Sequence, residues 1–161
     1  MAELRRGLER LGFERVLTYV QSGNVIFAAG SDDPGEHAAA IERLIERDFG
    51  LEAKALVLTA MQMAEIAAAN PFLDSGADER SLHATFLFEP VSQVTFAALE
   101  LPAREGEQVV LGERVAYLHL PHGYGRTKLS NAYFERALRT PATTRNWRTV
   151  TALVELCSGD T

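Results

Sequence analysis

The part of the sequence best equipped for chemistry runs from 122 to 150, where basic, aromatic and small polar residues are concentrated. It holds six lysines and arginines against one acid, Glu135, in a chain whose formal net charge is -6. Lysine and arginine side chains bind phosphate and carboxylate groups through charge-assisted hydrogen bonds. The basic stretch, as we call residues 122–150, therefore predicts a surface for an anionic ligand.

Two helices are predicted within the basic stretch, over about 127–139 and 144–157, with Thr143 as N-cap of the second. A helix start leaves N–H groups unpaired and favours phosphate. A short turn at Pro141 joins the two helices, so they are expected to run antiparallel. Their starts then lie at opposite ends, unless this turn brings the chain back. We expect at least one start to bind an anion, above all Thr143–Arg145. The candidate ligand-binding residues are Tyr124, Arg126, Lys128, Thr143, Thr144, Arg145 and Asn146.

A plainer interpretation is that these arginines are solvated charges at helix ends. Similarly, Tyr124 stands between two glycines, a pattern more typical of a strand-to-helix turn than of a phosphate loop. The helical spacing of Trp147, Val150 and Val154 predicts a buried Trp147 and an exposed Arg145.

Three functions fit these residues. The first is a binding module for a small anionic ligand or a nucleic-acid end. The alternative is an enzyme acting on a phosphorylated metabolite or nucleotide in a cleft between lobes, with Lys128 or His122 as acid–base group, although no catalytic residue is identified. The third is a protein-interaction domain whose basic face meets an acidic partner.

Metal and cofactor chemistry finds little support. His83, His119 and His122 have neither a cysteine pair nor the helical spacing typical of zinc ligands, so no metal and no cofactor is predicted. Cys157 falls on an apolar helix face, where a thiol is typically inert. Because it is the only cysteine, an intrachain disulfide is excluded, which suits a reducing compartment.

Composition sets the broad class. The 161 residues are 47% apolar and 24% charged, which is typical of a folded globular protein. The acidic average argues against bulk binding to nucleic acid or anionic membranes. No signal peptide or long apolar run is present. These features predict a cytoplasmic protein with no membrane partner, and they leave its oligomeric state open.

The first half of the chain has helix and strand patterns in the order α-β-β-α-β-α. The expected elements are a helix over 2–11, a hairpin over 15–29, a helix over 35–48, a strand over 53–59 and a short helix begun by a Thr59–Gln62 capping box. This order is that of a ferredoxin-like lobe whose first strand is missing. Because that strand is central in such a sheet, we expect a missing N-terminal segment and an open slot with unpaired backbone groups.

The second half predicts a smaller α+β lobe. A polar linker is expected over 73–81. A strand over 82–88, a helix over 92–100 and a hairpin over 108–120 then precede the basic stretch. The fold class is therefore α+β, with lobes at 1–72 and 82–161.

Several segments resemble a family of small bacterial proteins known only as domain of unknown function 1697. They are GYGRTKLSNAYFERAL and TPATTRNWRTVTAL in the basic stretch, together with Tyr19–Phe27, Asn70-Pro71-Phe72 and the strand Leu82–Leu87. The resemblance implies an α+β fold with a ferredoxin-like N-terminal lobe, and no established activity. Family members usually begin with a further strand and a glycine-rich turn, which this sequence lacks.

Overall fold

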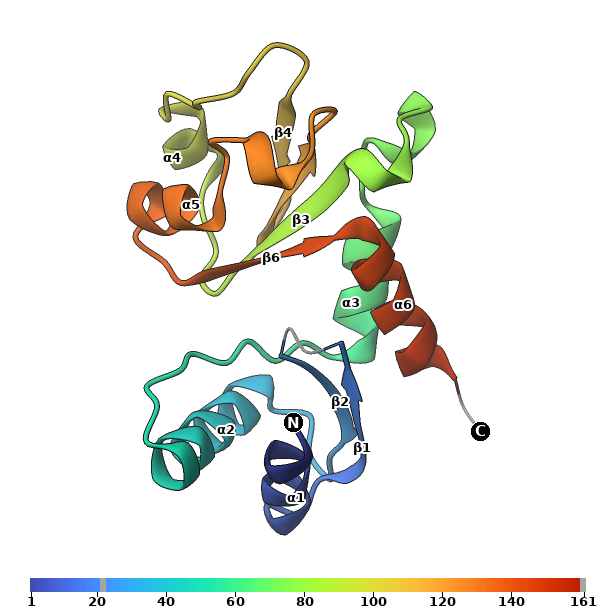
Figure 1. Cartoon of the computed structure of the whole chain (residues 1–161), viewed down its shortest axis with the longest axis vertical. Coiled ribbons are helices and arrows are strands. Elements are labelled where there is room, and N and C mark those ends of the chain that lie inside the picture. The colour runs from blue at the N-terminus through green and yellow to red at the C-terminus, as the bar shows by residue number, and fades with distance from the viewer. Residues whose placement is uncertain (21–22, 160–161) are drawn as a thin grey trace. The chain divides into compact units, whose positions relative to one another are not determined.

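A computed structural model describes residues 1–20 and 23–159, and it shows an α+β structure with two antiparallel sheets (Figure 1). The chain divides into two compact units. The N-terminal unit comprises residues 1–63 and 155–161, and the C-terminal unit comprises residues 64–154. The linker predicted at 73–81 lies inside the C-terminal unit, so the division between units comes earlier in the chain.

The predicted helices and hairpin of the N-terminal unit are confirmed. Its elements are α1 (Ala2–Arg10), β1 (Glu14–Tyr19), β2 (Asn24–Ala28), α2 (Pro34–Phe49) and the start of α3 (Ala60–Ala68). The Asp33 carboxylate caps α2 by accepting the Glu36 N–H at 3.0 Å, and Gly50 ends it in the left-handed conformation. The predicted capping box of α3 is present, because Thr59 Oγ1 accepts the Gln62 N–H at 3.1 Å.

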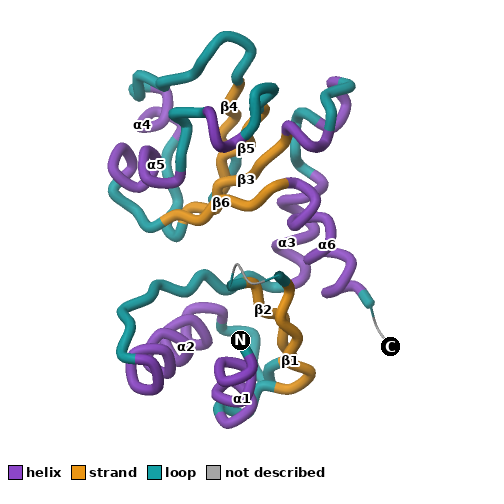
Figure 2. Tube along the Cα trace, viewed as in Figure 1, coloured by secondary structure: helices purple, strands orange, loops and turns teal. Residues whose placement is uncertain are grey.

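The strand predicted over 53–59 is wrong, since residues 50–59 form a loop (Figure 2). One backbone group of this loop is bound by a helix side chain, because the Ala55 N–H donates to Glu42 Oε1 at 2.9 Å. An apolar run becomes a strand only where a neighbouring strand pairs with it. The sheet here holds only β1 and β2, so the far edge of β2 faces no strand among the described residues.

The core of the N-terminal unit is small. Four residues of its apolar cluster are buried, namely Leu8, Phe13, Val16 and Leu44. The helices α1 and α2 approach closely at Gly7, where an added Cβ would lie 2.9 Å from Leu44 Cδ2. Phe13 stacks on Phe27 of β2 with ring centroids 4.2 Å apart, which joins the helices to the sheet.

The C-terminal unit is built on a four-stranded antiparallel sheet in the order β4-β5-β3-β6. Its elements are η1 (Leu73–Ser75), η2 (Glu79–Ser81), β3 (Leu82–Leu87), α4 (Gln93–Ala97), β4 (Gln108–Leu111), β5 (Val115–His119), η3 (Tyr124–Arg126), α5 (Asn131–Leu138), β6 (Ala142–Asn146) and most of α6 (Trp147–Ser158). The predicted strand over 82–88 and the hairpin over 108–120 are confirmed.

Two helices cover one face of this sheet, where α4 and α5 lie together (Figure 1). Phe96 of α4 and Phe134 of α5 pack with Leu87, Leu118 and Ala142 of the strands. This larger apolar cluster fixes the position of α5 and therefore of its first residues.

Both helices predicted in the basic stretch begin later than expected. The first starts at Asn131 after a Ser130 N-cap. Residues 142–146 form β6, which pairs with β3, so Thr143 is not an N-cap. Instead, Asn146 Oδ1 accepts the Thr149 N–H at 2.8 Å and caps α6. The reason is that β-branched threonines suit a strand and β3 offers an unpaired edge.

The two burial predictions for this segment have opposite outcomes. Trp147 is 2% exposed, which confirms the prediction that it is buried. Arg145 is half-buried rather than exposed. Because Arg145 lies on a strand, its side chain follows the two-residue alternation of β6 and not the helical wheel.

Candidate anion-binding site

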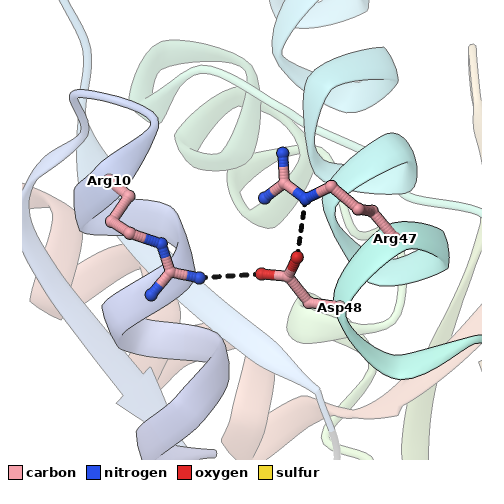
Figure 3. A network of polar contacts seen from close by, with 3 residues as sticks. All are labelled: Arg10, Arg47 and Asp48. Carbon is pink, nitrogen blue, oxygen red and sulfur yellow. Dashed lines mark hydrogen bonds and ion pairs between the residues drawn. The ribbon is translucent and has the colours of Figure 1, made fainter.

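The ion pairs between described residues all lie in the N-terminal unit. Figure 3 shows how Asp48 of α2 pairs with two arginines of this unit, Arg10 and Arg47. Arg47 Nε lies 2.6 Å and Arg10 Nη2 lies 2.7 Å from the carboxylate oxygens of Asp48. The hydrogen bond from Arg47 is the largest cause of a lowered pKa at Asp48.

In the basic stretch, five cations form no ion pair with any residue that the structure describes. They are Arg126, Lys128, Arg136, Arg139 and Arg148, and all five are exposed. Unneutralised cations raise the local concentration of anions and provide donors for them. In the chain, Arg126 is in η3 with Tyr124, Lys128 is two residues further on, and Arg148 is in the first turn of α6.

Five residues form a set of polar contacts, and we call them the His83 cluster: His83, Thr85, Tyr124, Asn131 and Thr144. Thr144 Oγ1 lies 2.8 Å from Thr85 Oγ1 and donates to Asn131 Oδ1 at 3.3 Å. The Asn131 N–H donates to the Tyr124 hydroxyl at 2.8 Å. The ring of Tyr124 stacks on His83, with centroids 5.4 Å apart. The start of α5 is thereby fixed to β3 and β6.

The start of α6 adjoins the same cluster. Asn146, the cap of α6, is the cross-strand neighbour of His83. The turn that carries Arg126 follows Tyr124, which stacks on His83. Arg148 occupies the first turn of α6. The start of α5 contacts Thr144, and the start of α6 follows Asn146, two residues further along β6.

Side chains cap both helix starts. At α5, Tyr124 and Ser130 accept the N–H groups of Asn131 and Tyr133. At α6, the Asn146 side chain accepts the N–H group of Thr149. The first turn of a helix attracts negative charge. Both helix starts are therefore candidate anion sites.

Two predicted site residues lie on the other face of β6, because neighbouring strand residues point to opposite faces. Arg145 Nη1 donates to Thr143 Oγ1 at 2.6 Å and to the Thr144 carbonyl at 3.0 Å. Burial lowers the pKa of Arg145. Thr143 and Arg145 are therefore separated from Tyr124 and Thr144, and the helix start predicted at Thr143–Arg145 does not exist.

The histidines do not form a metal site. His119 packs near Phe72, and His122 Nε2 lies 3.3 Å from the Glu105 carbonyl. Across residues 1–20 and 23–159, no group of three or more His, Cys, Asp and Glu side chains is placed to hold a metal. Burial raises the pKa of Cys157, which disfavours the reactive thiolate.

Three members of the His83 cluster were not predicted from sequence, namely His83, Thr85 and Asn131. The sequence does contain a pattern that points to His83 and Thr85. Both are polar residues at alternate positions of the otherwise apolar strand β3, so both point to the face that carries the core. Buried polar side chains on a core face need partners. The two polar residues within an apolar strand therefore predict polar partners on the same face of the sheet.

His83 should make the stability of the fold depend on pH. Burial lowers the pKa of His83, so its ring is neutral in the folded state when the unfolded chain begins to take up a proton. Stability is therefore full above the ordinary pKa of about 6.5 and is lost as the pH falls below it. We expect the melting temperature to fall on acidification from about pH 7 to about pH 5, and His83→Gln to flatten that fall. Equal slopes in the two proteins would contradict this expectation.

The comparisons with known proteins bear on the family and the fold. A family model described as a protein of unknown function (DUF1697) matches residues 1–117. The chain belongs to this family. The match includes His83 and Thr85 but ends before Tyr124, so the basic stretch lies outside it.

A solved structure supports the same fold. It is the conserved bacterial protein SP0830 from Streptococcus pneumoniae, with a TM-score of 0.71 and 24% identity over 98% of this chain and 88% of that chain. At this identity the likeness shows the fold alone. No curated protein matches. In the described part of the chain, no helix is both long and apolar enough to cross a membrane.

Proposed function

We propose that the C-terminal unit binds a small anionic ligand that bears a phosphate group, beside the His83 cluster and the starts of α5 and α6. The observation that carries this proposal is the set of exposed, unpaired cations beside the His83 cluster. In the N-terminal unit, by comparison, Arg10 and Arg47 are paired with Asp48. A cationic edge left without such partners is suited to an external anion.

Each part of the site has a separate role in this proposal. The N–H groups in the first turn of α6, that of Arg148 among them, would donate to phosphate oxygens. Arg126 and Arg148 would neutralise its charge through planar donor groups, and Lys128 as a point charge. Tyr124 would present the edge or face of its ring to the remainder of the ligand. A mononucleotide or the end of a nucleic-acid strand has this combination of phosphate and ring.

The test is thermal stabilisation by inorganic phosphate, nucleoside monophosphates and short oligonucleotides. A ligand present at about 100 times its dissociation constant should stabilise the protein by about 2.7 kcal/mol. Removing a charged donor by Arg126→Ala or Arg148→Ala should weaken binding about tenfold, as loss of a charge-assisted hydrogen bond does.

Arg136→Ala is the matched control. Arg136 is also an exposed, unpaired arginine of the basic stretch, but it lies in the last turn of α5, away from the helix start. It should leave the dissociation constant unchanged. Equal losses in all three arginine variants would indicate general attraction by charge, and no stabilisation by any of these ligands would contradict the proposal.

A further inference from the structure

His83 is a titratable side chain inside the C-terminal unit, beside the proposed anion site. It is 8% exposed, and the strand β3 that carries it has no other charged or titratable residue. Its Nδ1 atom is buried and has no hydrogen-bond partner in the part of the chain that the structure describes. A buried polar atom of this kind is uncommon in folded proteins and calls for a physical explanation.

The side chains that the structure places around His83 are uncharged. The ring of Tyr124 in η3 stacks on it, with centroids 5.4 Å apart and planes at 25°. Its cross-strand neighbours are Leu118 of β5 and Asn146 of β6. From α5, the Asn131 N–H donates to the Tyr124 hydroxyl. None of these four side chains carries a charge at neutral pH.

Charged groups on the surrounding elements do not neutralise His83. His119 of β5 and Arg145 of β6 point to the opposite face of the sheet, because strand residues alternate. Glu135 of α5 accepts the N–H of Ala142, at the other end of β6. The remaining cations of η3, α5, α6 and the turn between η3 and α5 are exposed, namely Arg126, Lys128, Arg136 and Arg148. Among the described residues, no carboxylate forms an ion pair with His83, so a protonated ring has no counter-charge there.

We propose that anion binding at this site is coupled to protonation of His83, an inference that rests on the proposed function. The first turn of α6 begins directly after Asn146, the cross-strand neighbour of His83. An anion held there supplies a negative charge beside the histidine. Because an opposite charge favours the protonated form of a histidine, one proton passes from the solvent to the ring when the anion binds.

The coupling acts in both directions. Burial lowers the pKa of His83, so its ring is neutral at about pH 7 before the anion binds. At lower pH the ring takes up a proton, and its positive charge then attracts the anion more strongly. Thermodynamic linkage requires that protonation favours the anion by the same factor by which the anion favours protonation. The site should therefore bind its anion more tightly as the solution becomes acidic.

The test is the affinity for sulfate, whose own charge is constant across the range in which histidine titrates, about pH 5 to pH 8. Isothermal titration calorimetry at constant ionic strength should show binding at least about fivefold tighter at about pH 5.5 than at about pH 7.5. His83→Gln cannot take up the proton and should bind sulfate equally at both pH values. His122→Gln, which removes an exposed histidine of the same unit, is the matched control and should retain the pH dependence.

Histidine ring signals in NMR spectra of the unsubstituted chain give a second measurement. The titration midpoint of His83 should move to higher pH in sulfate than in chloride of equal ionic strength, and by more than that of His119 on the opposite face. Equal sulfate affinity at the two pH values, a pH dependence that persists in His83→Gln, or a His83 midpoint that sulfate does not move would overturn the coupling and leave anion binding standing. No sulfate binding at either pH would also overturn the coupling, and the proposed function would fall with it if nucleoside monophosphates failed to bind as well.

Discussion

Phe134→Ala is expected to lower the free energy of unfolding by about 3–5 kcal/mol, the usual range for removing a buried aromatic ring. The Phe134 side chain is fully buried between α5 and the four-stranded sheet. Its loss leaves a cavity in the larger of the two cores, and equilibrium urea unfolding measures the change. Arg136→Ala, two residues along the same helix but exposed, should change stability by less than about 0.5 kcal/mol.

The same variant tests whether ligand binding depends on the packing of α5. Phe134 does not reach the helix start itself, but its burial fixes α5, whose first residue contacts Tyr124 and Thr144. We therefore expect weaker ligand binding together with the loss of stability. A loss below about 1 kcal/mol would show that the ring does not pack as the structure indicates.

Leu44→Ala is expected to cost about 2–5 kcal/mol in the N-terminal unit. Leu44 is 1% exposed, and its Cδ2 fills the space that the absent side chain of Gly7 leaves. The cluster around it has four buried members among the described residues, so the loss of Leu44 removes a large part of this core. Thermal unfolding monitored by circular dichroism measures the loss. Leu51→Ala, which removes the same atoms from an exposed position, is the control and should have little effect.

Local sequence signals predicted the helices and the hairpin in the first half of the chain. In the structure, Asp33, Pro34 and Gly50 each satisfy a backbone requirement at an end of α2. The capping box at Thr59 is equally local. Such signals need no knowledge of tertiary contacts, which is why they could be read from the residues alone.

The errors arose where distant segments decide the structure. Residues 53–59 have the composition of a strand but lack a paired neighbour, and residues 142–146 became a strand because β3 was available to pair with them. The helical spacing from Trp147 onward correctly identified α6, but spacing cannot show where a preceding strand ends. The resulting shift of three residues moved Arg145 from an exposed helix face to the half-buried side of a strand.

The candidate site was predictable in part for the same reason. The concentration of charge and the presence of Tyr124 are properties of the local sequence. The partners of Tyr124 and Thr144 come from β3 and α5, and the hydrogen bond between Thr85 and Thr144 joins residues 59 positions apart. Only the folded sheet shows that His83 lies beside both Tyr124 and the start of α6.

The central claim is that an anion binds where these elements meet. Its most direct test is a titration of the isotopically labelled protein with a nucleoside monophosphate, followed by the backbone amide signals in NMR spectra. The account predicts saturable shifts at Trp147, Arg148 and the residues around Tyr124 and Arg126, with smaller changes at Thr143 and Arg145 on the opposite face of β6. Saturable shifts confined to other parts of the chain, or no saturable shift at all, would contradict it.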